Sequence, residues 1–154
     1  MVTTYVKRND STYTHDRTCV YNLNYHIIWG TKYRNKWMTP DLEDEIKNLL
    51  RTIAEENGFS IEHCEIGLDD HVHLLVSAPP KLSVTVIVKC LKGTSAFRLF
   101  RLHPELKKFY WKGTDRHIWS PSYFVESIGT TNQNAVAKYI DDQRAKEQKR
   151  DARS

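Results

Sequence analysis

The sequence predicts an α+β fold of the ferredoxin-like or RRM-like type, an antiparallel βαββαβ sheet with helices on one face and an added C-terminal helix. Strand-like and helical apolar patterns alternate along the chain in the order β, α, β, β, α, β, α. Only a short polar connection, residues 68–70, separates two consecutive strand-like runs, which is typical of a hairpin. The length of 154 residues, with 40% hydrophobic and 27% charged residues, predicts one domain over residues 1–154. We expect residues 1–20 to form an N-terminal arm and residues 144–154 a charged tail.

The first half of the chain predicts a strand followed by an amphipathic helix. Residues 21–29 (YNLNYHIIW) alternate in polarity and are rich in aromatic and β-branched side chains, as in a strand. Thr39 followed by Pro40 is typical of an N-cap and the first helical position, and Asn57-Gly58 is typical of a helix end. Between them, apolar residues recur at helical spacing at Leu42, Ile46, Leu49, Leu50 and Ile53. We therefore expect one face of this helix to pack on the sheet.

The second half predicts a hairpin, two helices and a last strand. Residues 59–67 and 71–77 form the two strands of the hairpin. A helix follows, because apolar residues recur at i, i+3, i+4 and i+7: Val84, Ile87, Val88 and Leu91. The aromatic-rich residues 109–128 predict a loop and then a long last strand that ends at Gly129. The last helix is predicted from one shared face, Val136, Tyr139, Ile140 and Gln143, before a frayed charged end at 146–150.

Composition excludes several classes of protein. Apolar stretches such as residues 84–88 are far shorter than the roughly 20 residues of a membrane span. Residues 1–10 do not resemble a signal peptide, so we expect no membrane segment and a cytoplasmic protein. Cys19, Cys64 and Cys90 are odd in number and far apart, which predicts buried free thiols instead of disulfides or a zinc cluster. The net charge of 23 − 19 = +4 permits a polyanionic partner without requiring one.

Two histidines lie at i and i+2 of the second hairpin strand. Side chains at this spacing point to the same face, so the imidazoles of His71 and His73 project together. The intervening apolar residues point to the core, which leaves the histidines on the opposite surface, where ring nitrogens can hold a metal ion. The alternative is a pair of half-exposed strand histidines without a ligand.

The last helix carries a second candidate pair. Tyr139 and Gln143 are at i and i+4 and therefore lie one above the other on the same helix face. Tyrosine can act as a covalent nucleophile, and a metal ion on a scissile phosphate would orient it for in-line attack. The alternative for Tyr139 is an ordinary core aromatic residue at helical spacing.

Five motifs together carry a resemblance to a known family. In chain order they are Lys32-Tyr33-Arg34, Asp70-His71-Val72-His73-Leu74-Leu75, Leu91-Lys92-Gly93-Thr94-Ser95, Ser122-Tyr123-Phe124-Val125 and Val136-x-x-Tyr139-Ile140-x-x-Gln143. With these motifs, which span most of residues 21–143, the chain resembles the single-tyrosine HUH transposases of bacterial and archaeal insertion sequences. These are the TnpA-like enzymes, in a superfamily that includes REP-associated transposases.

The resemblance implies a site and a reaction. His71, His73 and Gln143 would be ligands of a divalent metal, Mg²⁺ or Mn²⁺, while Tyr139 is the nucleophile and Tyr123 belongs to sheet packing. Such an enzyme is a DNA strand transferase that cleaves and rejoins single-stranded DNA at insertion-sequence ends. Attack of the tyrosine gives a 5′-phosphotyrosine and a free 3′-OH without ATP. The family also implies hairpin-forming transposon ends as substrate and a homodimer in which active sites can assemble in trans.

Basic residues set among aromatic ones are candidates for DNA contacts. Lys89 and Lys92 are three residues apart and predict a stripe toward a phosphate backbone. Lys32 and Arg34 flank Tyr33, whose ring would stack on an unpaired base. The alternative for each of them is a solvated surface charge.

Two other functions remain open. A domesticated member of the same family would process palindromes in the host genome with the same site. A non-catalytic RRM-like nucleic-acid-binding module has the same strand order, but the chain lacks the K/R-G-F/Y-G/A-F-V-x-F/Y stretch that is typical of such modules. It would also have no use for the two histidines, Tyr139 and Gln143 together.

Overall fold

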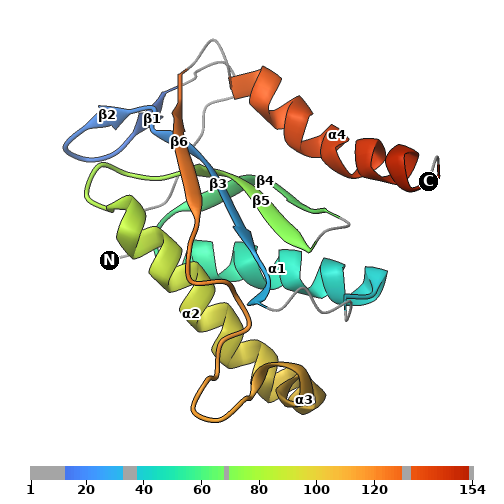
Figure 1. Ribbon diagram of the computed structural model, residues 1–154. Coiled ribbons are helices and arrows are strands. Elements are labelled where there is room, and N and C mark those ends of the chain that lie inside the picture. The colour runs from blue at the N-terminus through green and yellow to red at the C-terminus, as the bar shows by residue number, and fades with distance from the viewer. Residues whose placement is uncertain (1–12, 33–37, 68–69, 130–132, 153–154) are drawn as a thin grey trace.

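A four-stranded antiparallel sheet organises the computed structural model, which describes residues 13–32, 38–67, 70–129 and 133–152 (Figure 1). The strands lie in the order β4-β5-β3-β6 and are β3 (Asn24–Gly30), β4 (Ser60–Ile66), β5 (His71–Ser77) and β6 (Phe124–Ile128). All neighbouring pairs are antiparallel. The first strand of the βαββαβ unit thus lies between the third and the fourth, which confirms the ferredoxin-like plan.

Helices cover both faces of this sheet (Figure 1). The long ones are α1 (Pro40–Glu56), α2 (Val84–Leu102) and α4 (Gln133–Asp151). Helices α1 and α2 lie on one face, and α4 crosses the other. The hydroxyls of Thr39 and Ser83 cap α1 and α2 by accepting backbone N–H bonds at 3.3 and 3.2 Å. Gly58, with φ +80°, follows the end of α1 as predicted.

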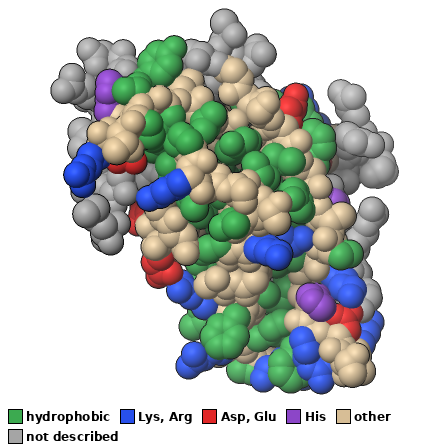
Figure 2. Space-filling view, turned by 90° about the vertical axis from the view of Figure 1, so that its left-hand side faces the viewer, with side chains coloured by type: hydrophobic (Ala, Val, Ile, Leu, Met, Phe, Trp, Pro, Cys, Tyr) green, Lys and Arg blue, Asp and Glu red, His purple; other side chains and the backbone are tan. Residues whose placement is uncertain are grey.

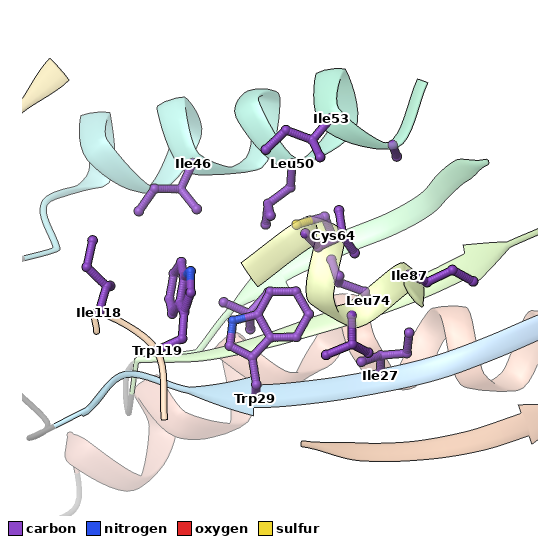
Figure 3. Packing of buried hydrophobic residues seen from close by; sticks show 14 of the residues in the cluster. Ile27, Trp29, Ile46, Leu50, Ile53, Cys64, Leu74, Ile87, Ile118 and Trp119 are labelled. Carbon is purple, nitrogen blue, oxygen red and sulfur yellow. The ribbon is translucent and has the colours of Figure 1, made fainter. Parts of the chain in front are cut away.

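The main core lies between the sheet and the helices α1 and α2 (Figure 3). Ile46, Leu50 and Ile53 of α1 are fully buried there, which confirms the apolar face predicted from their spacing. From the sheet, Trp29 packs edge-on against Trp119 with ring centroids 5.9 Å apart. The indole N–H of Trp119 donates to the hydroxyl of Ser95 at 2.8 Å, so this buried polar group is paired.

The N-terminal arm contains more structure than we predicted. Strands β1 (Thr14–His15) and β2 (Val20–Tyr21) pair as a small antiparallel sheet at the end of the segment expected to be an aperiodic arm. Tyr21 belongs to β2, so the strand expected over residues 21–29 begins only at Asn24. The backbone N–H of Asp16 donates to the carbonyl of Cys19 at 2.8 Å and closes the turn between the strands. Strands of two residues are too short to produce a detectable alternation, which is why the sequence pattern missed them.

The segment before the last strand also differs from the prediction. A 3-10 turn η2 (Pro104–Leu106) and a short helix α3 (Lys107–Tyr110) follow α2, and α3 extends into the start of the expected loop. The last strand is shorter than expected, because β6 begins only at Phe124. Residues 118–120 run beside the end of β3 through single backbone bonds, such as Ser120 N–H to the Gly30 carbonyl at 2.8 Å. At the other end of the chain, α4 continues to Asp151 through residues expected to fray.

The cysteines are free, but they are not equally buried. Cys64 is buried, and burial raises the pKa of its thiol to about 12, so the thiol stays protonated. Cys19 and Cys90 are half-buried, which corrects the expectation of three buried thiols. Among the described residues, no helix is long and apolar enough to cross a membrane.

Candidate functional site

Strand β5 places both predicted histidines on the sheet face that α4 crosses. Val72, Leu74 and Val76 are fully buried in the main core, so His71 and His73 point to the opposite face, as the alternation predicts. His73 is buried at 6% exposure and His71 is half-buried. Both are therefore held by the strand, and His71 is the more exposed of the two.

Gly30 makes room for the ring of His71. The two residues are direct partners in the β3–β5 register. An ideal Cβ built on Gly30 would lie 2.9 Å from Nε2 and 3.2 Å from Cδ2 of His71. Real Cβ contacts are essentially never that short, so the imidazole occupies the space that any other side chain at position 30 would fill.

Helix α4 brings Tyr139 to the same face. A small apolar cluster docks the helix on the sheet: Leu75, Ile128, Ala137 and Ile140. Tyr139 itself is 45% exposed, and the ammonium of Lys146 lies 5.1 Å from its ring centroid. The tyrosine is thus not the buried core aromatic of the alternative interpretation, because its neighbour Ile140 provides the docking contact instead.

A third histidine, which the sequence analysis did not select, joins these groups. His26 on β3 is buried at 6% exposure, and its ring centroid lies 6.1 Å from that of His73 and 6.3 Å from that of Tyr139. Burial lowers the pKa of His26, and the charge of Glu126, its partner on β6, opposes this only in part. A histidine within the aromatic and aliphatic run 25–29 (YHIIW) was the available signal.

Gln143 lies one turn after Tyr139 and is half-buried. Its side-chain nitrogen donates to Glu147 at 3.2 Å, so the amide oxygen, the atom that would bind a metal, is not the atom used in that bond. Within the described part of the chain, no group of three or more His, Cys, Asp or Glu side chains is arranged to hold a metal ion. A metal site here would therefore rest on two imidazoles and an amide oxygen.

A groove of about 1050 Å³ lies along α2 and the segment that follows it. Its lining combines basic and aromatic side chains: Lys89, Phe97, Arg101, Lys107, Trp111 and Arg116. Lys and Arg side chains are interspersed among hydrophobic ones on this side of the molecule (Figure 2). Trp111 is contacted by Lys107 and Arg116, whose charged groups lie 4.5 and 4.4 Å from its ring centroid. This composition suits a polyanion with exposed planar groups.

The predicted DNA-contacting residues differ in their surroundings. Lys89 is exposed and lines the groove. Lys92 also lines it, but its ammonium donates to the backbone carbonyls of Ser120 at 2.5 Å and Ser122 at 3.2 Å, and burial lowers its pKa. Lys32 lines the groove and is paired with Asp115. Tyr33 and Arg34 lie outside the described residues.

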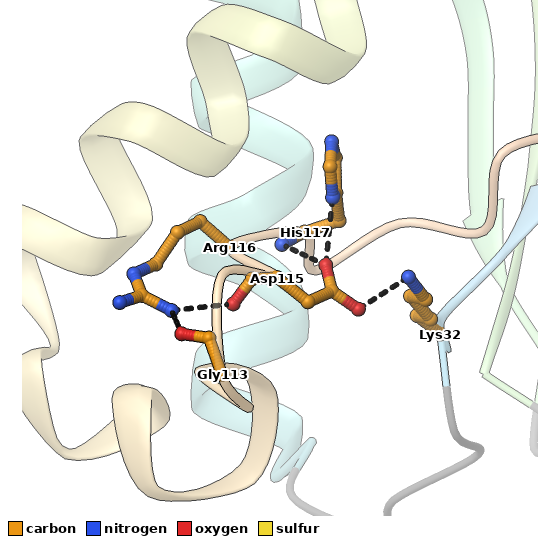
Figure 4. A network of polar contacts seen from close by, with 5 residues as sticks. All are labelled: Lys32, Gly113, Asp115, Arg116 and His117. Carbon is orange, nitrogen blue, oxygen red and sulfur yellow. Dashed lines mark hydrogen bonds and ion pairs between the residues drawn. The ribbon is translucent and has the colours of Figure 1, made fainter.

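Lys32 belongs to a polar network at the rim of the groove (Figure 4). It forms an ion pair with Asp115, whose other carboxylate oxygen accepts a bond from the ring of His117 at 2.7 Å. Arg116 donates to the carbonyl of Gly113 at 2.5 Å, and Gly113 adopts φ +61° in the turn. This network holds the loop that carries Arg116, one of the cations of the groove.

Tyr123 does not occupy the sheet-packing position that we expected. It is 38% exposed, precedes β6 and lines the groove. The next residue, Phe124, points to the other face, where its ring meets that of His26 edge-on with centroids 6.1 Å apart. Tyr123 therefore faces the groove, whereas Phe124 faces His26. Among the described tyrosines, only Tyr139 has a ring contact with His26.

Comparisons with known proteins agree on one family. A family model described as IS200-like transposase matches residues 19–143. The chain is 40% identical over 131 residues to the ISDra2 transposase TnpA of Deinococcus radiodurans, covering 85% of this chain and 91% of that protein. It is 31% identical over 120 residues to the transposase for insertion sequence element IS200 of Salmonella typhimurium, covering 78% and 76%.

Solved structures show the same similarity. A crystal structure from Deinococcus radiodurans R1, described as that of a transposase, is 38% identical with a TM-score of 0.65, over 82% of this chain and 95% of that one. The structure of a REP-associated tyrosine transposase bound to a REP hairpin is 14% identical with a TM-score of 0.59, over 80% and 67%. The second similarity concerns the fold alone.

Proposed function

The chain belongs to the family of IS200-like transposases, and on that premise we propose that it cleaves and rejoins single-stranded DNA at insertion-sequence ends with Tyr139 as the nucleophile. One observation supports the proposal. The ring of His26 contacts both Tyr139 and His73, so an accessible phenol and one of the proposed ligand imidazoles flank the same histidine on one face of the sheet. A nucleophile next to nitrogen ligands is what metal-assisted phosphoryl transfer requires.

The reaction has two steps that mirror each other. In the first, the phenolic oxygen of Tyr139 attacks the phosphorus of a phosphodiester, the bond to the 3′ oxygen breaks, and the departing oxygen ends as a 3′-OH with the proton that the phenol loses. The DNA strand keeps its 5′ phosphate as a phosphotyrosine. In the second step the 3′-OH of another strand attacks this phosphorus and the phenol is restored. The number of phosphodiester bonds is unchanged, so no ATP is needed.

The chemistry of these residues is compatible with a divalent metal. In the proposed site the imidazoles of His71 and His73 would supply two nitrogen ligands, and the amide oxygen of Gln143 would supply a third. The ring of His71 fills the space next to Gly30, and a larger side chain at position 30 would displace it. The glycine therefore allows the imidazole to take this position. Mg²⁺ or Mn²⁺ bound there would neutralise charge on the phosphate and orient it for in-line attack. Three protein ligands leave positions open for phosphate oxygens and water.

We propose that the groove along α2 binds a part of the DNA that lies apart from the reacting phosphate. Lys89 and Arg101 offer cations to a phosphate backbone, and Trp111 offers a ring on which an unpaired base can stack. The REP-associated tyrosine transposase, which has a similar fold, is bound to a REP hairpin in its solved structure. A hairpin-forming transposon end is therefore the substrate that we propose for this chain.

We further propose that the protein acts as a homodimer. Strand β6 is an edge of the sheet, and it exposes Phe124 and Val125 at 51% and 38%. Unpaired edges of this kind invite pairing with another chain. Because Tyr139 contacts His26 of its own chain, we expect active sites assembled in cis. Mixing a His71→Ala/His73→Ala double variant with Tyr139→Phe tests this, since activity of the mixture requires assembly in trans.

The test of the function is formation of a covalent adduct. Wild-type protein, Tyr139→Phe and the matched control Tyr123→Phe are mixed with labelled single-stranded DNA that carries the hairpins flanking the gene, in Mg²⁺ or Mn²⁺. We expect a denaturant-resistant protein–DNA adduct with the wild type and Tyr123→Phe and none with Tyr139→Phe, which still binds DNA. An adduct that persists in Tyr139→Phe would move the nucleophile elsewhere. Tight binding without any adduct would favour a non-catalytic RRM-like module.

A further inference from the structure

His26 lies at the centre of the candidate site without belonging to the ligand or nucleophile set. Its imidazole is stacked on that of His73, with an interplanar angle of 28°, and meets the ring of Tyr139 edge-on at 74°. Centroid separations of 6.1 and 6.3 Å fall within the range in which aromatic rings attract one another in offset and edge-on arrangements. Strand β3 thus supplies one ring that contacts both functional groups.

Ring contacts define the orientation of this imidazole. His26 is buried, and within the described part of the chain its Nε2 atom has no hydrogen-bond partner. Phe124 closes a third side, edge-on at 6.1 Å and 76°. The backbone of His26 is fixed on both sides, since it pairs with Leu75 of β5 and Glu126 of β6. The ring is therefore a rigid surface anchored in the centre of the sheet.

We infer that His26 is a positioning residue, whose ring fixes the phenol of Tyr139 relative to the imidazole of His73. The inference rests on the proposed function and adds a residue to it. The apolar cluster that docks α4 does not include Tyr139, and its ring is 45% exposed, so the ring needs a further contact to hold one position. Loss of the His26 ring would leave the nucleophile in several orientations, of which few are productive.

The experiment compares two substitutions of His26 that differ in ring content. His26→Leu removes the planar ring, whereas His26→Phe retains it and removes the nitrogens. We expect His26→Leu to slow single-turnover adduct formation at saturating DNA by about 10–100-fold, as a displacement of about 1 Å would. The dissociation constant for DNA should change less than twofold. His26→Phe should restore the rate to within about threefold of the wild type, since the edge-on and stacked contacts remain.

His63 offers a matched control on the same face of the sheet. It also reaches α4, through Asp141 at 3.3 Å, but its side chain is 36% exposed, and among the described contacts none joins it to Tyr139 or His73. We expect His63→Leu to leave the adduct rate within twofold of the wild type. If His63→Leu slows adduct formation as much as His26→Leu does, any disturbance of the docking of α4 is enough to slow the reaction. That result would overturn the inference.

A second readout does not depend on activity. Mn²⁺ is titrated into DNA-free protein and the free ion is followed by electron paramagnetic resonance. Because the His26 ring also stacks on His73, we expect weaker Mn²⁺ binding in His26→Leu than in the wild type and near-normal binding in His26→Phe. Equal slowing in both His26 variants would show that a ring nitrogen matters and would overturn positioning by ring contact, as would a wild-type rate in His26→Leu. If the wild type forms no adduct, the proposed function fails, and the order of Mn²⁺ affinities decides the inference.

Discussion

Replacing Gly30 by alanine should move the ring of His71 while it leaves the stability of the fold nearly unchanged. The new Cβ would lie 2.9 Å from Nε2 of His71, whereas ordinary contacts begin at 3.4 Å. The ring must therefore withdraw by about 0.5 Å. Since the atoms in contact are at the far end of a side chain, the imidazole can move while the backbone register between β3 and β5 is kept.

The effects on stability and on rate should differ in size. Alanine in a strand loses less conformational entropy than glycine, which contributes about 0.5–1 kcal/mol to stability, and an off-rotamer imidazole costs about 0.5–1.5 kcal/mol. We therefore expect a free energy of unfolding within about 1 kcal/mol of the wild type. A misplacement of 1 Å costs about 100-fold in rate, so a shift of half that size should slow adduct formation by about tenfold.

The assay combines urea unfolding, Mn²⁺ titration and single-turnover adduct formation. Gly129→Ala is the matched control, because a Cβ at that position meets nothing within 4 Å. We expect Gly30→Ala to weaken Mn²⁺ binding and slow the adduct, and Gly129→Ala to change neither. A Gly30→Ala protein with normal Mn²⁺ affinity and normal rate would refute the reasoning that this glycine makes room for a functional imidazole.

Two further predictions concern the groove and the helix ends. Lys89→Ala should weaken DNA binding and lower its salt dependence at unchanged thermal stability. Lys92→Ala should lower thermal stability, because two backbone carbonyls lose their donor. The reverse pattern in binding and melting measurements would contradict the assignment of Lys89 to DNA binding and of Lys92 to the fold. Burial lowers the pKa of His103, but its bonds to Glu45 and Glu105 outweigh this and raise the pKa. The resulting stabilisation is complete below the unfolded-state pKa of about 6.5 and is lost as pH rises through the higher folded value. His103→Gln should therefore lower the free energy of unfolding more at pH 6 than at pH 8.5, and an equal loss at both values would rule out the charged contact.

Local patterns were sufficient for most of the fold. Thr39-Pro40 and Asn57-Gly58 marked the ends of α1 because capping depends on residues within one turn of the helix end. The alternation around His71 and His73 placed both rings opposite the core because neighbouring strand residues must face opposite sides. What these patterns missed was either too short to repeat, as in β1 and β2, or held by distant contacts.

The histidine site depends on contacts that no local pattern contains. The sequence by itself determined that His71 and His73 share a face and that Tyr139 shares a helix face with Ile140 and Gln143. Only the tertiary structure showed that His26 contacts His73 and Tyr139, and that Lys92 binds backbone carbonyls as well as lining the groove. The physical reason is that periodicity specifies which side of its own element a residue occupies. Which sides meet is decided by strand order and register, and these follow from burying the whole apolar surface at once.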